Sequence, residues 1–365
     1  MTTDADSRET HIHMRKIFSI LILTVCCAGA AFAAQPIEAN LDMHKGDWVG
    51  VYLAADDGSA ILSVDNAEAR HSRVMKVSGT GVSTMADVDG ITINHMVPLE
   101  GGKYEVGGGT GSDYVTRVVT FANGTAQTLW DSSHLPNRNA SVSVSADGAK
   151  WVAMKGVDRD TIELQFGDTT SYKPSLSIRL GGSSSVPAKA MRFIADSEGV
   201  QYLRRNPDAV AVVWHGMAYV VQPGGSEPMT ALLSTGEGAG RMRWDAAADT
   251  LWVEGATGWF AFDRATAVEK TQKHAFKKPQ KEVHDTFGNG QNADLFTLKG
   301  GGYATAFETM GKHSLRVERS GSAASHKDLP QLNSSSSVLH VSPSANTVVM
   351  LPSGVTSGRV IVTQN

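Results

Sequence analysis

The stretch Ser143–Val152, which reads SVSADGAKWV, has the pattern of one strand, a tight turn and a second strand. Serine and valine alternate up to the dipeptide Asp147–Gly148, and Lys150–Met154 continues as an apolar run. Gly accepts a positive φ and Asp tolerates one, so this dipeptide can reverse the chain between two strands. A further β-rich run at Thr161–Phe166 predicts a third strand and therefore an antiparallel sheet.

The same pair of β-rich runs recurs along the rest of the chain, each time after a turn signal such as Asp57–Gly58, Gly101–Gly102 or Ala345–Asn346. Successive turn signals are about 48 residues apart on average, and a regular period of this size indicates a repeat protein. Seven hairpins are predicted: Ala60–Val64 with Val74–Val77, Tyr104–Val106 with Val115–Phe121, Lys150–Met154 with Thr161–Phe166, Ala211–Trp214 with Met217–Val221, Thr250–Val253 with Trp259–Phe262, Tyr303–Phe307 with Leu315–Val317, and Thr347–Leu351 with Arg359–Val362.

This period predicts the fold class. Repeats of 40 to 50 residues that hold four short strands are typical of propeller blades. We therefore expect an all-β fold, a seven-bladed β-propeller of four-stranded antiparallel blades. The last repeat ends soon after its third strand, so Gln35–Leu41 is expected to supply the missing outer strand and close the ring. Trp151, Trp214, Trp252 and Trp259 lie in the hairpin runs, and we interpret them as packing residues between blades.

The stretch Ser143–Val152 resembles the strand–turn–strand signature of WD-repeat-like and related exported bacterial propellers. His340–Asn346, which reads HVSPSAN, resembles a degenerate copy of it. The resemblance implies the propeller fold and no particular family. The Gly-His and Trp-Asp dipeptides of WD repeats are absent at their expected places.

The first 33 residues predict export. Arg15 and Lys16 precede the apolar run Ile17–Ala28, and Ala31–Ala33 provides the small residues that signal peptidase recognises. We expect a signal peptide over residues 14–33 with cleavage after Ala33. An uncleaved membrane anchor is the alternative, because the apolar run is just long enough for a marginal span.

The segments on either side of this signal have different roles. Residues 1–13 are polar, and we interpret them as a non-native upstream extension with Met14 as the true start. Residues 34–365 are expected to form a single propeller domain. Both cysteines, Cys26 and Cys27, lie inside the signal, so the mature chain can form no disulfide. These features favour a periplasmic or secreted protein.

Composition limits the partners. The chain has 33 basic and 37 acidic residues, a net charge of -4, which argues against a general nucleic-acid binder. No segment after the signal is long and apolar enough to predict a transmembrane helix. We expect an envelope protein or a small ligand as partner.

Candidate binding residues come from one rim. In a propeller, the loops between the second and third strands and the loops between blades share a rim, and loops on a rigid scaffold carry function. His215, in the turn Trp214–Gly216, could be a metal ligand or general base, although an exposed turn histidine is the preferred interpretation. His284 and Asp285 could orient one another, but adjacency alone does not make a dyad. The predicted rim residues are His134, Arg138, Asn139, His215, Arg241, His284 and Asp285, with Asp113, Asn292 and His313 nearby.

No cofactor is predicted. Asp158 and Asp160 share a loop and could bind calcium through their carboxylates, but Arg159 between them opposes this, and a polar turn is preferred. Calcium or another metal stays open as an alternative. The chain lacks a Gly-x-Ser-x-Gly elbow, a His-Glu-x-x-His motif and a P-loop.

Two functions follow. The first is an exported, non-catalytic scaffold that binds a protein or ligand and serves as an envelope or secretion-associated accessory factor. The second is a propeller enzyme of the lactonase, lyase or quinone-dependent dehydrogenase type, with its site in the axial channel. Convergence of His134, Arg138, Arg241, His284 and Asp285 would favour the enzyme, whereas scattering would favour the scaffold.

Overall fold

A computed structural model of the chain confirms the all-β class. It describes residues 35–136, 141–158, 161–181, 199–203, 209–214, 216–223, 229–233, 239–245, 248–263, 276–286, 290–309, 312–329, 338–352 and 354–364. Within these ranges the regular structure consists of strands and two short 3-10 turns, η1 (Glu100–Gly102) and η2 (Ser132–His134). The expected upstream extension and signal peptide lie outside the described residues. No helix in the described ranges is long and apolar enough to cross a membrane.

All seven predicted hairpins are confirmed as antiparallel strand pairs. They are β3 (Ala60–Asn66) with β4 (His71–Ser78), β7 (Lys103–Gly109) with β8 (Tyr114–Ala122), β11 (Lys150–Gly156) with β12 (Thr161–Asp168), β15 (Val210–Trp214) with β16 (Met217–Gln222), β19 (Thr250–Glu254) with β20 (Trp259–Asp263), β24 (Tyr303–Thr309) with β25 (Lys312–Glu318), and β28 (Thr347–Leu351) with β29 (Arg359–Gln364).

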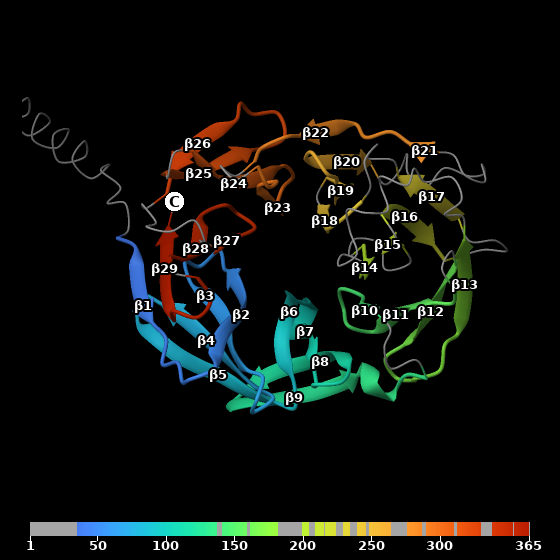
Figure 1. The fold of residues 1–365 in the computed structure, drawn as a ribbon, viewed down its shortest axis with the longest axis horizontal. Helices are drawn as coiled ribbons and strands as arrows, with labels where there is room; N and C mark the ends of the chain where they lie inside the picture. Colours follow the sequence, from blue (N-terminus) through green and yellow to red (C-terminus); the bar gives the residue numbers. More distant parts are fainter. Residues whose placement is uncertain are drawn as a thin grey trace, which may run out of the picture.

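Each hairpin is extended on both sides. The strand that precedes each hairpin lies on the side of the ring centre in Figure 1, and we call these the inner strands: β2 (Asp47–Ala54), β6 (Thr92–Pro98), β10 (Ser141–Val144), β14 (Gly199–Tyr202), β18 (Met242–Asp245), β23 (Asp294–Thr297) and β27 (Val338–Val341). The outer strands are β5 (Gly81–Asp89), β9 (Gly124–Asp131), β13 (Leu176–Gly181), β17 (Met229–Leu233), β22 (Lys281–Val283), β26 (Ser325–Asp328) and β1 (Ile37–Asn40).

The strands of the described ranges form six sheets. Four are four-stranded and antiparallel, with the orders β10-β11-β12-β13, β18-β19-β20-β22, β23-β24-β25-β26 and β1-β29-β28-β27. A fifth, β14-β15-β16-β17, gains a short parallel strand, β21 (Phe276–Lys277). The sixth has eight strands, because the outer strands β5 and β9 of two consecutive meanders pair in parallel. This sheet folds back on itself, so that Gly50 of β2 lies against the carbonyl of Ile93 in β6.

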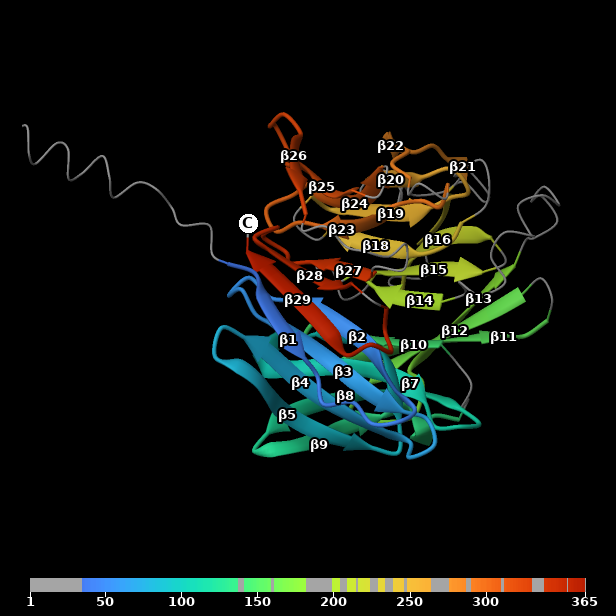
Figure 2. The ribbon, with the colours of Figure 1, turned by 60° about the vertical axis from the view of Figure 1, so that its left-hand side comes forward.

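The sheets follow one another around a ring in sequence order (Figure 1). The view in Figure 2 shows neighbouring sheets lying face against face. Ile37–Asn40 pairs antiparallel with the last strand, from Ile37 opposite Val362 to Asn40 opposite Arg359. The prediction that the segment around Gln35–Leu41 completes the last sheet is therefore confirmed.

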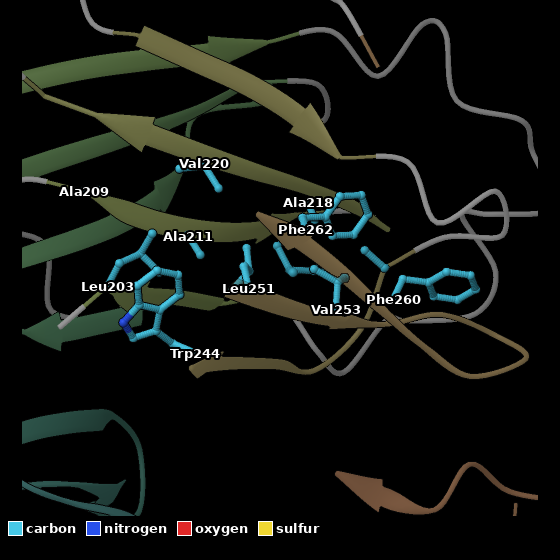
Figure 3. Close-up of a cluster of buried hydrophobic side chains, with 12 residues drawn as sticks. Leu203, Ala209, Ala211, Ala218, Val220, Trp244, Leu251, Val253, Phe260 and Phe262 are labelled. Atoms are coloured by element: carbon cyan, nitrogen blue, oxygen red, sulfur yellow. The ribbon is translucent and has the colours of Figure 1, made fainter. Parts of the chain in front are cut away.

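The hydrophobic core lies between sheets. One cluster joins Ala211, Val213 and Val220 of one sheet to Leu251 and Phe262 of the next (Figure 3). Other clusters join the first and last sheets, and the two halves of the eight-stranded sheet. Burying an aliphatic or aromatic side chain contributes about 1.5–3 kcal/mol, so each sheet depends on its neighbours for stability. Trp151, Trp252 and Trp259 are buried in such clusters, as predicted for packing residues.

Candidate functional site at the inner strands

The candidate site lies where four inner strands are linked in series. Thr297 of β23 donates its hydroxyl to the carbonyl of Trp244 in β18, at 3.3 Å. Phe296 of β23 packs edge-on against His340 of β27, with ring centroids 5.4 Å apart. The backbone N–H of Ala54 in β2 donates to Nδ1 of His340 at 3.0 Å. The strands β18, β23, β27 and β2 are thus linked along one arc of the ring.

Arg241, which directly precedes β18, ties two sheets together. Its Nε and Nη2 donate to the Glu254 carboxylate at 2.7 and 2.9 Å, and its Nη1 donates to Asp294. The guanidinium also lies over the Trp259 ring, with Cζ 5.4 Å from the ring centroid. The hydrogen bonds to Glu254 and the charge of Asp294 raise the pKa of Arg241 above its usual value.

These contacts agree with the prediction that loops between the second and third strands and loops between sheets lie on one rim. Glu254 ends the second strand of its sheet, whereas Arg241 and Asn292 lie in segments that join successive sheets. The Asn292 amide donates to the Gly255 carbonyl at 2.8 Å. Residues from the two kinds of loop therefore meet at the same side of the ring.

Arg243 lies two residues further along the strand and is partly buried. Alternate residues of a strand share a face, and the Cζ of Arg243 lies 5.9 Å from the centroid of the same Trp259 ring. Its Nη1 donates to the Met242 carbonyl at 3.0 Å. Among the described residues no carboxylate forms an ion pair with Arg243. Burial and the neighbouring Arg241 charge lower the pKa of Arg243.

His340 and Tyr52 are hydrogen-bond donors at neutral pH. Burial and the charge of Arg243 lower the pKa of His340 to about 4, so the ring is neutral. Because Nδ1 accepts from Ala54, the single ring proton must be on Nε2. Burial and the charge of Asp294 raise the pKa of Tyr52 to about 12, so its hydroxyl keeps its proton. We call Tyr52, Arg241, Arg243, Glu254, Asp294 and His340 the inner-strand cluster.

The predicted rim histidines make separate contacts. His134 is exposed in η2, with Nδ1 3.3 Å from the Asp131 carbonyl and its ring 4.9 Å from that of Tyr172. His284 is exposed, with Nδ1 3.0 Å from the Thr257 carbonyl and Nε2 3.3 Å from the Glu282 carboxylate.

Asp285 has partners of its own. It accepts from Arg316 at 3.1 Å and from the Thr305 hydroxyl at 2.5 Å. His284 and Asp285 are therefore bound to different groups despite being neighbours in the chain. The other three predicted residues, Arg138, Asn139 and His215, lie outside the described residues.

The sequence predicted Arg241 as a site residue but not most of the residues around it. Arg243, Asp294, Glu254 and Tyr52 come from three sheets, and only the folded ring brings them together. The available signal was the spacing Arg241-x-Arg243, which places two guanidinium groups on one face of a predicted strand.

A second feature is a hollow of about 280 Å³ between the sheets that start with β18 and β23. Trp252 and Tyr303 line it, together with the ion pair between Lys281 and Glu318. The Tyr303 hydroxyl donates to Glu318 at 2.7 Å, and Lys281 Nζ lies 4.7 Å from the Tyr303 ring centroid. Lys281 and Glu318 in this hollow thus already satisfy one another.

In the described part of the chain, no three His, Cys, Asp or Glu side chains are placed to hold a metal ion. The calcium candidate Asp160, with Arg159, lies outside that part. Comparison with models of known protein families found no match, and comparison with curated proteins found no similar sequence.

Proposed function

We propose that the chain is an exported seven-bladed β-propeller that acts as a non-catalytic scaffold and binds a protein or small ligand of the cell envelope. The blade count is supported by seven hairpins, each preceded by an inner strand and followed by an outer strand. In this interpretation β2–β5 and β6–β9 are two blades whose outer strands pair, and the other five sheets are one blade each.

Ring closure supports treating residues 34–365 as one domain. The last blade takes three strands from the end of the chain and its outer strand, β1, from the start. A blade completed in this way covers the edge of β29, which would otherwise be open to pairing with another chain.

The observation that carries the binding function is the separation of the rim side chains. His134, Arg241, His284 and Asp285 each form their own local contacts, whereas a catalytic site needs such groups to converge on one reacting atom. A rigid ring with polar side chains spread along one rim instead provides several contact points for a partner.

Export rests on the signal over residues 14–33 and has a direct test. The chain with a C-terminal tag should accumulate in the periplasm as a species that begins at Ala34, which intact-mass measurement would identify. A variant with Ala31→Leu and Ala33→Leu should stay uncleaved, because signal peptidase needs small residues there. A wild-type chain that stays in the membrane uncleaved would favour the anchor alternative.

Capture from envelope extracts tests the scaffold. The mature chain is immobilised beside two variants, His134→Ala with His284→Ala on the proposed binding rim, and Lys76→Ala in an exposed pair with Asp57 near the opposite rim. We expect a protein that the wild type and Lys76→Ala retain and the rim variant loses. Metal analysis is run on the same samples. A bound ion without any protein partner would instead favour the enzyme alternative.

A further inference from the structure

We propose that the inner-strand cluster binds an oxyanion, a carboxylate or phosphate group of a small ligand, through Arg243, His340 and Tyr52. The inference rests on the proposed binding function and names the chemistry of the ligand at that site. It depends on three donors that approach from β18, β27 and β2.

Arg243 provides the charge. A guanidinium has five N–H donors, and within the described residues Arg243 uses its side chain only for the Met242 carbonyl and the Trp259 face. The nearby carboxylates of Glu254 and Asp294 are both bonded directly to Arg241. A partly buried cation without a bonded anion is costly, and an oxyanion with two acceptor atoms fits its planar fork.

His340 and Tyr52 provide neutral donors beside this charge. The Nδ1 of His340 is occupied by Ala54, so Nε2–H is the donor that remains for a ligand. Tyr52 lies two residues from Ala54 on β2, on the same side of that strand. Both residues are partly rather than fully buried, so each keeps some exposed surface.

Direct contacts link the strands that carry the three groups, since β23 contacts both β18 and His340 of β27, and His340 is bonded to β2. The Arg243 charge lowers the pKa of His340 and also acts on Tyr52. The Nε2–H of His340 and the Tyr52 hydroxyl can each donate one hydrogen bond, and the guanidinium charge beside them favours an acceptor of negative charge. In the hollow near Lys281, by contrast, that lysine is already paired with Glu318.

The test uses the mature chain, residues 34–365, with sodium phosphate, acetate and citrate as separate probes against sodium chloride at equal ionic strength. Thermal unfolding and calorimetric titration are measured for wild type, Arg243→Gln, Arg243→Lys and Arg359→Gln. Arg359 is the matched control, an arginine of β29 paired with Glu38 of the outer strand β1. Comparing the effect of phosphate with the effects of acetate and citrate shows whether the site binds a phosphate or a carboxylate group.

We expect at least one probe to raise the wild-type Tm by several degrees more than chloride does, because a ligand that binds only the folded state stabilises it. Arg243→Gln should bind that probe at least about tenfold more weakly, since it loses a charge-assisted bond. Arg359→Gln should match the wild type, and Arg243→Lys should fall between.

The inference is overturned if no probe exceeds chloride on the wild type, or if Arg243→Gln responds like the wild type. If Arg243→Gln does not fold, His340→Asn is measured in its place. This variant keeps an acceptor for the Ala54 N–H and loses the Nε2–H donor. A probe affinity of His340→Asn equal to that of the wild type would overturn the inference. Absent oxyanion binding with intact envelope capture contradicts only this inference. Absent capture with intact oxyanion binding contradicts only the protein-binding function.

Discussion

Asn123 and Gly124 join β8 to β9 with left-handed backbone angles, φ of 53° and 78°. Two positive φ values in a two-residue hairpin loop define a type I′ turn, which Asn-Gly favours. A Cβ at Gly124 would meet no atom within 4 Å, so replacement by alanine changes only the backbone preference. We expect Gly124→Ala to lower the free energy of unfolding by about 1 kcal/mol in urea titration.

Gly79 is the control for this change. It also has open space around its Cβ position and lacks the positive φ of Gly124. Gly79→Ala should leave the urea midpoint unchanged or raise it slightly, because it restricts the unfolded chain. Equal losses in the two variants would show that the left-handed backbone is not the cause.

His340 makes stability depend on pH. Its pKa is about 4 in the folded protein and 6.5 for an ordinary histidine side chain, so between these pH values the unfolded chain binds a proton that the folded ring does not. Stability therefore falls as pH falls through this window. We expect the wild type to lose about 3 kcal/mol more than His340→Asn between pH 7 and pH 4, measured by urea unfolding at each pH.

Most of the candidate site was beyond prediction at the scale of single residues. Arg241 could be assigned to a rim because it precedes a recognisable hairpin. Tyr52 and Asp294 could not be assigned to it, since their proximity depends on how sheets far apart in the chain are arranged. Among the described residues, Arg243 can be recognised as a cation without a bonded carboxylate only because the structure shows that Glu254 and Asp294 are bonded to Arg241.

Turns explain why the hairpins could be predicted from sequence. In the stretch Ser143–Val152, the Ser145 hydroxyl accepts from Lys150 N–H at 2.9 Å, and Gly148 has a φ of 69°. In the degenerate copy, Ser342 accepts from Thr347 N–H at 3.1 Å, and Ala345 has a φ of 60°. The same local hydrogen bonds form despite the sequence change, so the pattern of strand and turn is set locally.

The joining of sheets is set by contacts of another kind. The parallel pairs β5 with β9 and β17 with β21 are only two residues long each. Such short edge pairings carry no periodic pattern of their own. They depend on sheets that have already packed, which is why four-stranded blades were predicted and the eight- and five-stranded sheets were not.

Arg241 tests the linkage between elements. Arg241→Gln leaves the Glu254 and Asp294 carboxylates without their shared cation. A fully buried pair would lose about 3–5 kcal/mol, but the Arg241 side chain is 40% exposed, so we expect about 1–2 kcal/mol. Arg359→Gln, in an exposed pair, should lose less than about 1 kcal/mol. Equal losses in urea titration would contradict the structural role of Arg241.

At the scale of the molecule, apolar faces are buried between neighbouring sheets and between the two halves of the eight-stranded sheet. A protein of this kind is stable only when the series of sheets is closed or capped, because an open end exposes both apolar area and a strand edge. Here the closing element is β1, whose Ile37 and Ala39 pack against the cluster shared by the first and last sheets.

Removing β1 tests whether the ring is closed in this way. A chain that begins at Leu41 loses the strand paired with β29 and leaves that edge open. We expect a lower urea midpoint and concentration-dependent association in size-exclusion chromatography, because an open edge can pair with another chain. A chain that begins at Ile37 keeps β1 and is the matched control, with a midpoint like that of the mature protein. If the chain from Leu41 stays monomeric with an unchanged midpoint, β1 contributes nothing to closure, and the ring must be held by the contacts between its sheets alone.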